Sequence, residues 1–114
     1  MNFEQFVDEL KVKMKFKNTI DVDDIVIYVL KDAVFFGKVT KIERDFKKKD
    51  EWWIISFVVF SIPINNASLI VRTPQMLGEE IFTIGGEERF FAPIDLTEEE
   101  PKEKKGMVLK LVKK

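Results

Sequence analysis

The sequence of 114 residues contains no cysteine and no histidine. Without cysteine there is no disulfide bond, thiolate nucleophile or zinc–thiolate site, and without histidine there is no Ser-His-Asp triad and no imidazole acid, base or metal ligand. The five glycines form neither a P-loop nor a G-x-G-x-x-G motif. We therefore expect a protein that is not an enzyme and that binds no cofactor.

A large excess of charge of either sign is also missing. Nineteen basic and twenty acidic residues give a net charge of −1, so no global field attracts nucleic acid or an anionic membrane, and nucleic acid is an unlikely partner on this count. The uncharged run 52–71 suggests a membrane span, but its strongly apolar part, 52–64, is too short for a spanning helix and contains Pro63. Residues 1–9 lack the basic and apolar regions of a signal peptide. We expect no membrane span and a cytoplasmic location.

Apolar residues recur at helical spacing near the N-terminus. Asn2 is a suitable N-cap residue, acidic residues come early in this segment and lysines come late, which suits the helix dipole. The apolar stripe consists of Phe3, Phe6, Val7, Leu10 and Met14. This pattern predicts an amphipathic helix over residues 2–16.

From Asp24 onward the pattern changes to that of β-strands. Segments rich in β-branched and aromatic residues alternate with turn residues such as Asn65-Asn66 and Gly85-Gly86. Gly37, inside the second segment, indicates a bulge or a close approach of backbones. The predicted strands are 25–30, 34–44, 52–62, 67–73, 80–84 and 89–94.

The segments 24–28 and 36–42 resemble the opening hairpin of SH3-like barrels. We therefore predict a mainly β (α+β) fold: a small antiparallel SH3-like or related barrel of about six strands, with the N-terminal amphipathic helix packed on it. Residues 1–96 form a single domain in this prediction, with all strands within 25–95. Residues 97–106 are predicted to be a charged linker, and residues 107–114 an apolar and basic tail or an extra strand.

The third predicted strand is apolar on both faces. Because successive strand residues point to opposite faces, Trp53, Ile55, Phe57 and Val59 share one face, and Trp52, Ile54, Ser56, Val58, Phe60 and Ile62 share the other. A half-exposed strand would alternate with polar residues, so we expect both faces to be covered. The first face suits the core. The second requires the N-terminal helix or a second subunit, which makes Trp52, Ile54, Phe60, Phe3, Phe6 and Leu10 the candidate partner interface.

Three polar groups are weaker candidates. The carboxylates Glu79, Glu80, Glu87 and Glu88 flank the hairpin at Gly85-Gly86 and, with Asp21, Asp23 and Asp24, are the possible metal or acid–base groups; a solvated, charged edge explains them more simply. The basic and aromatic tip 47–53 combines three lysines with Trp52 and Trp53, as nucleic-acid binders do, although Asp45, Asp50 and Glu51 nearly cancel the charge. Arg72 is a candidate anion contact, or pairs with a glutamate on the next strand.

These observations favour a non-catalytic interaction or regulatory module that binds a protein partner or forms a homodimer. Two alternatives remain: a nucleic-acid-binding barrel that uses the tip 47–53, and a small-ligand binder that uses Arg72. The sequence does not identify the partner.

Overall fold

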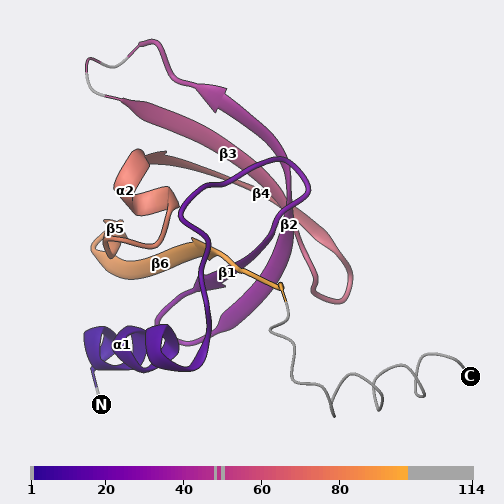
Figure 1. Ribbon diagram of the computed structural model, residues 1–114. Coiled ribbons are helices and arrows are strands. Elements are labelled where there is room, and N and C mark those ends of the chain that lie inside the picture. The colour runs from indigo at the N-terminus through magenta and orange to yellow at the C-terminus, as the bar shows by residue number, and fades with distance from the viewer. Residues whose placement is uncertain (1, 48, 50, 98–114) are drawn as a thin grey trace, which may run out of the picture.

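The computed structural model describes residues 2–47, 49 and 51–97 (Figure 1). These residues form one antiparallel sheet of six strands in the order β4-β3-β2-β1-β6-β5, curled into a half-barrel. The elements are α1 (Phe3–Lys13), β1 (Ile25–Val29), β2 (Val34–Arg44), β3 (Trp52–Val59), β4 (Asn65–Arg72), α2 (Thr73–Met76), β5 (Phe82–Ile84) and β6 (Glu87–Pro93). The mainly β prediction is confirmed, whereas an SH3-like identity stays a prediction. The predicted linker beyond Thr97 and the predicted tail or strand 107–114 lie outside the described residues.

Helix α1 begins where the sequence indicates and ends earlier than predicted. Asn2 is the N-cap: its side chain accepts a hydrogen bond from the Gln5 backbone at 2.8 Å, and the Gln5 side chain accepts one from the Asn2 backbone at 2.9 Å. The helix stops at Lys13 because the chain then becomes extended. Phe16 forms an isolated β-bridge with Ile94. The predicted helix 2–16 is therefore too long at its C-terminal end, where strand pairing replaces helical bonds.

All six predicted strands are present, and β2 has the predicted bounds. Gly37 is a position of close backbone approach, because a Cβ there would collide with the carbonyl oxygen of Val58 on β3. The irregularity in the β2–β3 register lies a few residues further on, between Val39 and Lys41. The β5–β6 turn uses Gly85 and Gly86, both at positive φ, where a side chain would be strained.

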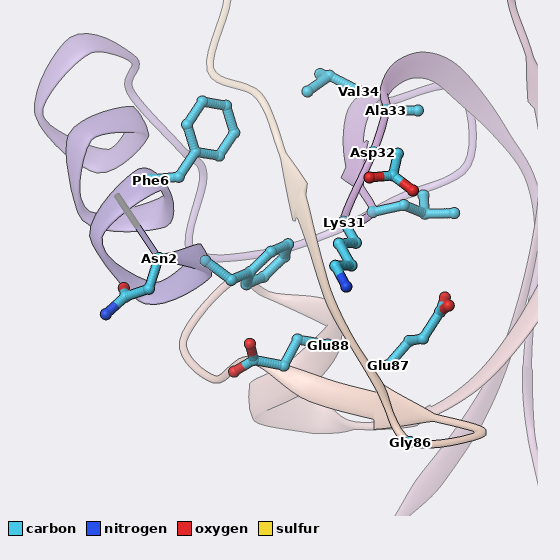
Figure 2. Close-up of a pocket in the computed structure, with 11 residues that line it drawn as sticks. Asn2, Phe6, Lys31, Asp32, Ala33, Val34, Gly86, Glu87 and Glu88 are labelled. Atoms are coloured by element: carbon cyan, nitrogen blue, oxygen red, sulfur yellow. The ribbon is translucent and has the colours of Figure 1, made fainter.

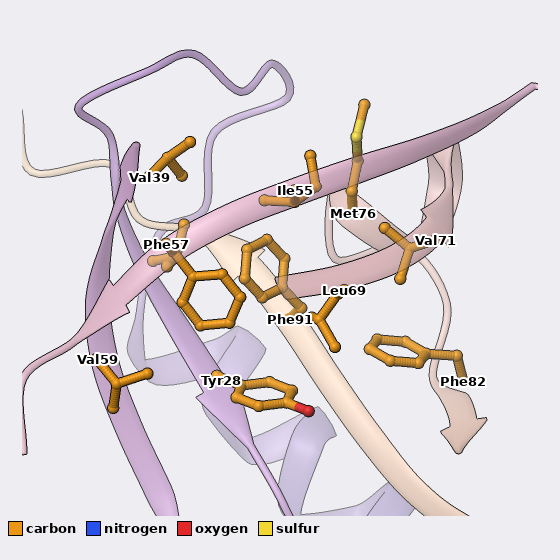
Figure 3. Packing of buried hydrophobic residues seen from close by; sticks show 11 residues of the cluster. Tyr28, Val39, Ile55, Phe57, Val59, Leu69, Val71, Met76, Phe82 and Phe91 are labelled. Carbon is orange, nitrogen blue, oxygen red and sulfur yellow. The ribbon is translucent and has the colours of Figure 1, made fainter. Parts of the chain in front are cut away.

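The inner side of the half-barrel holds the main core (Figure 3). Three rings meet there: Phe57 lies 5.6 Å from Tyr28 and 5.3 Å from Phe91, measured between ring centroids. Helix α2 contacts both β4 and β6 and contributes Met76 to this core, so it closes the side of the half-barrel where the sheet does not. Ile55, Phe57 and Val59 are buried here and the half-buried Trp53 packs against them, which confirms the predicted core face of β3.

A second cluster lies on the opposite side of β1 and β6. Val7 of α1 is 1% exposed and belongs to this cluster, and Phe3, Phe6 and Leu10 are partly buried against it. The strand residues of the cluster are Ile27, Val29, Phe90, Ala92 and Ile94. No β3 residue belongs to it, so the expectation that α1 covers the second face of β3 is wrong for the described residues. The stripe of α1 matches the apolar outer face of β1 and β6, a match that a helical pattern alone does not reveal.

The second face of β3 is consequently half-buried and not covered. Its residues lie opposite polar neighbours: Ile54 pairs with Glu43, and Val58 pairs with Lys38 on one side and with Asn66 of β4 on the other. Long charged side chains place aliphatic stems over apolar neighbours and keep their charge in water. Within one copy, this face of β3 has only partial cover from its own sheet, and its cover by a second subunit stays a prediction.

Candidate functional site

The six predicted interface residues fall into two separate sets. Trp52 and Ile54 lie half-buried on the outer face of β3, and Phe60, directly after β3, is 50% exposed. The other three, Phe3, Phe6 and Leu10, lie on α1 against the second cluster. The structure does not bring the two sets together, so a single surface built from all six is not formed by one copy of the chain.

Strand β4 is an edge of the sheet with an unpaired side. It comes last in the strand order, and within the part of the chain that the structure describes no strand pairs with its outer edge. The N–H of Arg72 donates to the side chain of Gln75 at 2.9 Å, so this residue presents its backbone away from β3. Because the N–H and C=O of one strand residue point the same way and successive residues alternate, Ile70, Ser68 and Asn66 also present theirs outward.

Exposed apolar side chains gather around this edge. Ile70 on β4 is 51% exposed, and the connection that precedes β4 exposes Ile62 at 102% and Ile64 at 64%. The backbone N–H of Phe60 donates to the carbonyl of Phe36 at 2.8 Å. These two half-exposed residues therefore lie on neighbouring segments of the sheet. Together with Phe60 and Phe36, we call Ile62, Ile64 and Ile70 the β4-edge patch.

A cleft of about 760 Å³ lies at another place, between α1 and two turns (Figure 2). Phe3 and Phe6 come from α1, Lys31 and Asp32 from the β1–β2 turn, and the β5–β6 turn closes the far side. The full lining is Asn2, Phe3, Phe6, Leu30, Lys31, Asp32, Ala33, Val34, Gly86, Glu87 and Glu88. The volume lies within the range of ligand-binding sites, and the lining combines apolar side chains with a charged rim.

The acidic hairpin β5–β6 does not place Glu80 opposite Glu88 or Arg89. Phe82 lies opposite Arg89 and Thr83 opposite Glu88, so Glu80 precedes the paired region and faces neither. Arg89 instead donates to the hydroxyl of Tyr28 at 2.7 Å. Among the described residues no group of three or more potential metal ligands forms a cation site.

The aspartates after α1 have structural partners. Asp24 pairs with Lys17, with a shortest N–O distance of 2.6 Å, and also accepts from the backbone N–H of Asp21. Asp23 lies 3.5 Å from Lys38. The carboxylates of Asp24 and Asp23 thus have lysine partners, and these contacts fix the approach to β1.

The basic tip and Arg72 have local contacts. The guanidinium of Arg44 lies 5.5 Å from the ring of Phe46 and 5.8 Å from that of Trp53, and Phe46 is 83% exposed. Residues 48 and 50 of the tip lie outside the described set. Arg72 lines a small hollow together with Glu51, whose carboxylate disfavours an anion there.

No family model, curated protein or solved structure matches this chain. Within the described ranges, no helix is long and apolar enough to cross a membrane.

Sequence reasoning identified Phe60 but missed the rest of the β4-edge patch and the cleft. The patch has a partial sequence signal: Ile70 shares one strand face with Ser68 and Asn66, and the apolar Ile62 and Ile64 come just before the strand. The sequence does not indicate that β4 is an edge strand, because that position depends on the order of strands in the sheet. The cleft has no local signal, because its lining residues come from three separate parts of the chain.

Proposed function

We propose that this chain is a non-catalytic interaction module whose binding surface is the outer edge of β4, and that the occupant is a second copy of the chain. The observation that carries the proposal is an eight-residue edge strand whose outer side pairs with no other strand among the described residues. Natural edge strands are protected by charge, proline, a bulge or shortness. Strand β4 has none of these before its last residue, Arg72.

The other edge of the sheet supports this choice by contrast. Strand β5 has only three residues, and Glu79, Glu80, Glu87 and Glu88 surround it. A short, acidic edge resists pairing with another chain. The protein therefore blocks one edge of its sheet and leaves the other open, as a protein that uses the open edge requires.

The register follows from which groups point outward. Antiparallel pairing centred on Ser68 aligns Ser68 of one copy with Ser68 of the other, and Ile70 with Asn66. All three pairs use outward-facing N–H and C=O groups, so the two copies exchange about six backbone hydrogen bonds. Each Arg72 then lies eight residues along the ladder from the other, about 27 Å, which avoids like-charge repulsion.

The same pairing covers exposed isoleucines of the β4-edge patch. Ile64 of one copy becomes a diagonal neighbour of Ile70 of the other, a spacing at which side chains on one sheet face touch. Ile62 approaches the region of Pro74 at the start of α2. Burial of these side chains, worth about 25 cal/mol per Å² of apolar surface, stabilises the pairing beyond its hydrogen bonds.

Light scattering after size exclusion tests the proposal, over total concentrations from about 10 µM to about 1 mM, where small interfaces associate. The wild-type mass should rise from 13.4 kDa toward twice that value. Two variants should stay monomeric: Ile70→Lys, which adds charge to the patch, and Ser68→Pro, which removes an outward N–H from an edge where proline is tolerated.

The matched control is Val12→Lys, which makes a similar change at an 86% exposed residue on α1. It should associate like the wild type, and circular dichroism should show that all variants keep the strand content. A wild-type chain that stays monomeric throughout, or an Ile70→Lys variant that associates as the control does, overturns the proposal.

The two other functions expected from the sequence have less support. A nucleic-acid barrel would use the exposed ring of Phe46 beside Arg44, but a net charge of −1 provides little counterion release. A small-ligand site at Arg72 would have to tolerate Glu51 in the same hollow. Retention on heparin at about 150 mM salt, lost in Phe46→Ala, would favour the first over the proposal.

A further inference from the structure

The cleft between α1 and the two turns combines an apolar wall with an acidic rim. Phe3 and Phe6 are both half-buried, so each keeps part of its ring toward solvent. Figure 2 shows the ring of Phe6 on the helix side and, at the start of β6, Glu88 and Glu87 with side chains that point in opposite directions. A ligand that fits this cleft must place apolar groups against the wall of Phe3 and Phe6 and positive charge at the acidic rim.

The lining residues are unequal in charge. They include three acids, Asp32, Glu87 and Glu88, and one lysine, Lys31. Glu87 lies 3.5 Å from the largely buried Arg89, so Glu88 and Asp32 are the acids of the lining without that partner. The cleft is therefore selective for a cationic and apolar chain segment over an anionic one.

This chain contains such a segment. Residues 107–114 read Met-Val-Leu-Lys-Leu-Val-Lys-Lys: five apolar residues, three lysines and no acid. The segment lies outside the described residues. The nine residues that separate it from Thr97, 98–106, contain no apolar side chain to be buried on the way.

The connection is long enough. Thr97 lines a hollow together with Ile25, at the beginning of β1, whereas Leu30, just beyond the end of β1, lines the cleft. Five residues of strand separate these two positions, about 17 Å. Nine extended residues span up to about 30 Å, so residues 98–106 reach from Thr97 to the cleft with slack to spare.

We propose that residues 107–114 dock in this cleft, with their apolar side chains on Phe3 and Phe6 and their lysines at the carboxylates of the two turns. The tether holds the segment near the cleft at an effective concentration on the order of millimolar, so a weak contact is sufficient. Docking covers the exposed parts of α1 and links it to the β5–β6 turn. It uses neither β4 nor the β4-edge patch, so it is independent of self-pairing.

Disulfide trapping tests the docking in the full chain, which has no cysteine of its own. One variant carries Val34→Cys in the cleft and Val112→Cys in the segment; the control carries Asn18→Cys and Val112→Cys. Asn18 is exposed and follows Lys17, which lines the same hollow as Thr97. Asn18 is therefore closer than Val34 to the start of the tether, and a segment that does not dock should reach Asn18 more readily. With oxidised glutathione at about 5 µM protein, where self-pairing is negligible, only the cross-linked monomer is counted.

Docking predicts that the Val34→Cys pair cross-links about tenfold faster than the control pair. Adding Glu88→Lys should reduce that advantage several-fold, as should about 1 M salt, which shortens the Debye length to about 3 Å. The same charge change at Asp8→Lys, an exposed residue of α1 that does not line the cleft, should leave it unchanged.

Equal or faster cross-linking at Asn18 overturns the proposal, and so does a fast Val34 reaction that Glu88→Lys and salt leave unaltered. If the Glu88→Lys variant fails to fold, the cross-linking rates of the Val34 and Asn18 pairs, and the effect of salt on those rates, still test the docking. A monomeric chain in the light-scattering experiment has no bearing on this result, so the two proposals can fail separately.

Discussion

Replacement of Phe57 by alanine is the strongest test of the half-barrel core. Phe57 is 1% exposed, stands on the inner face of β3, and contacts the rings of Tyr28 and Phe91 in the core. Removing a buried phenylalanine side chain typically costs about 3–5 kcal/mol, because transfer free energy is lost and a cavity remains. Two aromatic contacts, each worth about 0.5–1.5 kcal/mol, place the expected loss near the upper end, about 4–5 kcal/mol.

That loss is large compared with the whole stability of a domain of this size, about 6–17 kcal/mol. Urea denaturation followed by tryptophan fluorescence measures it, and an unchanged m-value would show that the same surface is exposed on unfolding. The control is Phe46→Ala, because Phe46 is 83% exposed and its loss should change stability by no more than about 0.5 kcal/mol. Equal effects of the two replacements, or a loss below about 1.5 kcal/mol at Phe57, would refute the assignment of the core to this face.

Two further predictions concern the backbone and the pH response. Gly37→Ala should destabilise the protein by about 2–3 kcal/mol in the same urea assay, because the new Cβ meets the Val58 carbonyl and the backbone of β3 cannot move away easily. Gly85→Ala should cost only about 1–2 kcal/mol, because its Cβ meets open space and only the positive φ is unfavourable. The pKa of Asp95 is lowered from its ordinary value of 3.8, chiefly because its carboxylate accepts a hydrogen bond from the Thr97 backbone at 2.9 Å. Because the pKa of this carboxyl is lower in the folded state, its ionised form stabilises the fold above about pH 3.8. That stabilisation is lost as the pH falls through the pKa of the folded state. Carboxyl carbon shifts in an NMR titration should show the low pKa, and Thr97→Pro, which removes the donor, should raise it; an unchanged value would contradict the assignment.

Much of the fold can be predicted from the sequence because the strand signals are local. Three signals each extend over only a few residues: the alternation of β2, the charged tip before Trp52 and the paired glycines at 85–86. The structure has strands at the positions that these signals indicate. The capping of α1 by Asn2 is equally local. The end of α1 was not predictable in this way, since the bridge between Phe16 and Ile94 joins distant parts of the chain.

The candidate site was less predictable because it depends on the order of strands. The pattern of β3 correctly indicated two apolar faces, but it does not state which element covers the second. Helix α1 packs beside β1 and β6, where Ile27 and Phe90 offer a larger apolar surface than the mixed neighbours of Ile54. Likewise, only the sheet order shows that β4 is an open edge while β5 is a short, acidic one.

Amide hydrogen exchange at two protein concentrations, read residue by residue by NMR, tests the central claim most directly. The outward N–H groups of Asn66, Ser68 and Ile70 are open to water in one copy and hydrogen-bonded in the proposed pair. Raising the concentration from about 20 µM to about 1 mM should slow their exchange several-fold and leave the N–H groups of Phe82–Ile84 on the opposite edge unchanged. Exchange at Ser68 and Ile70 that stays fast and independent of concentration would contradict pairing along β4.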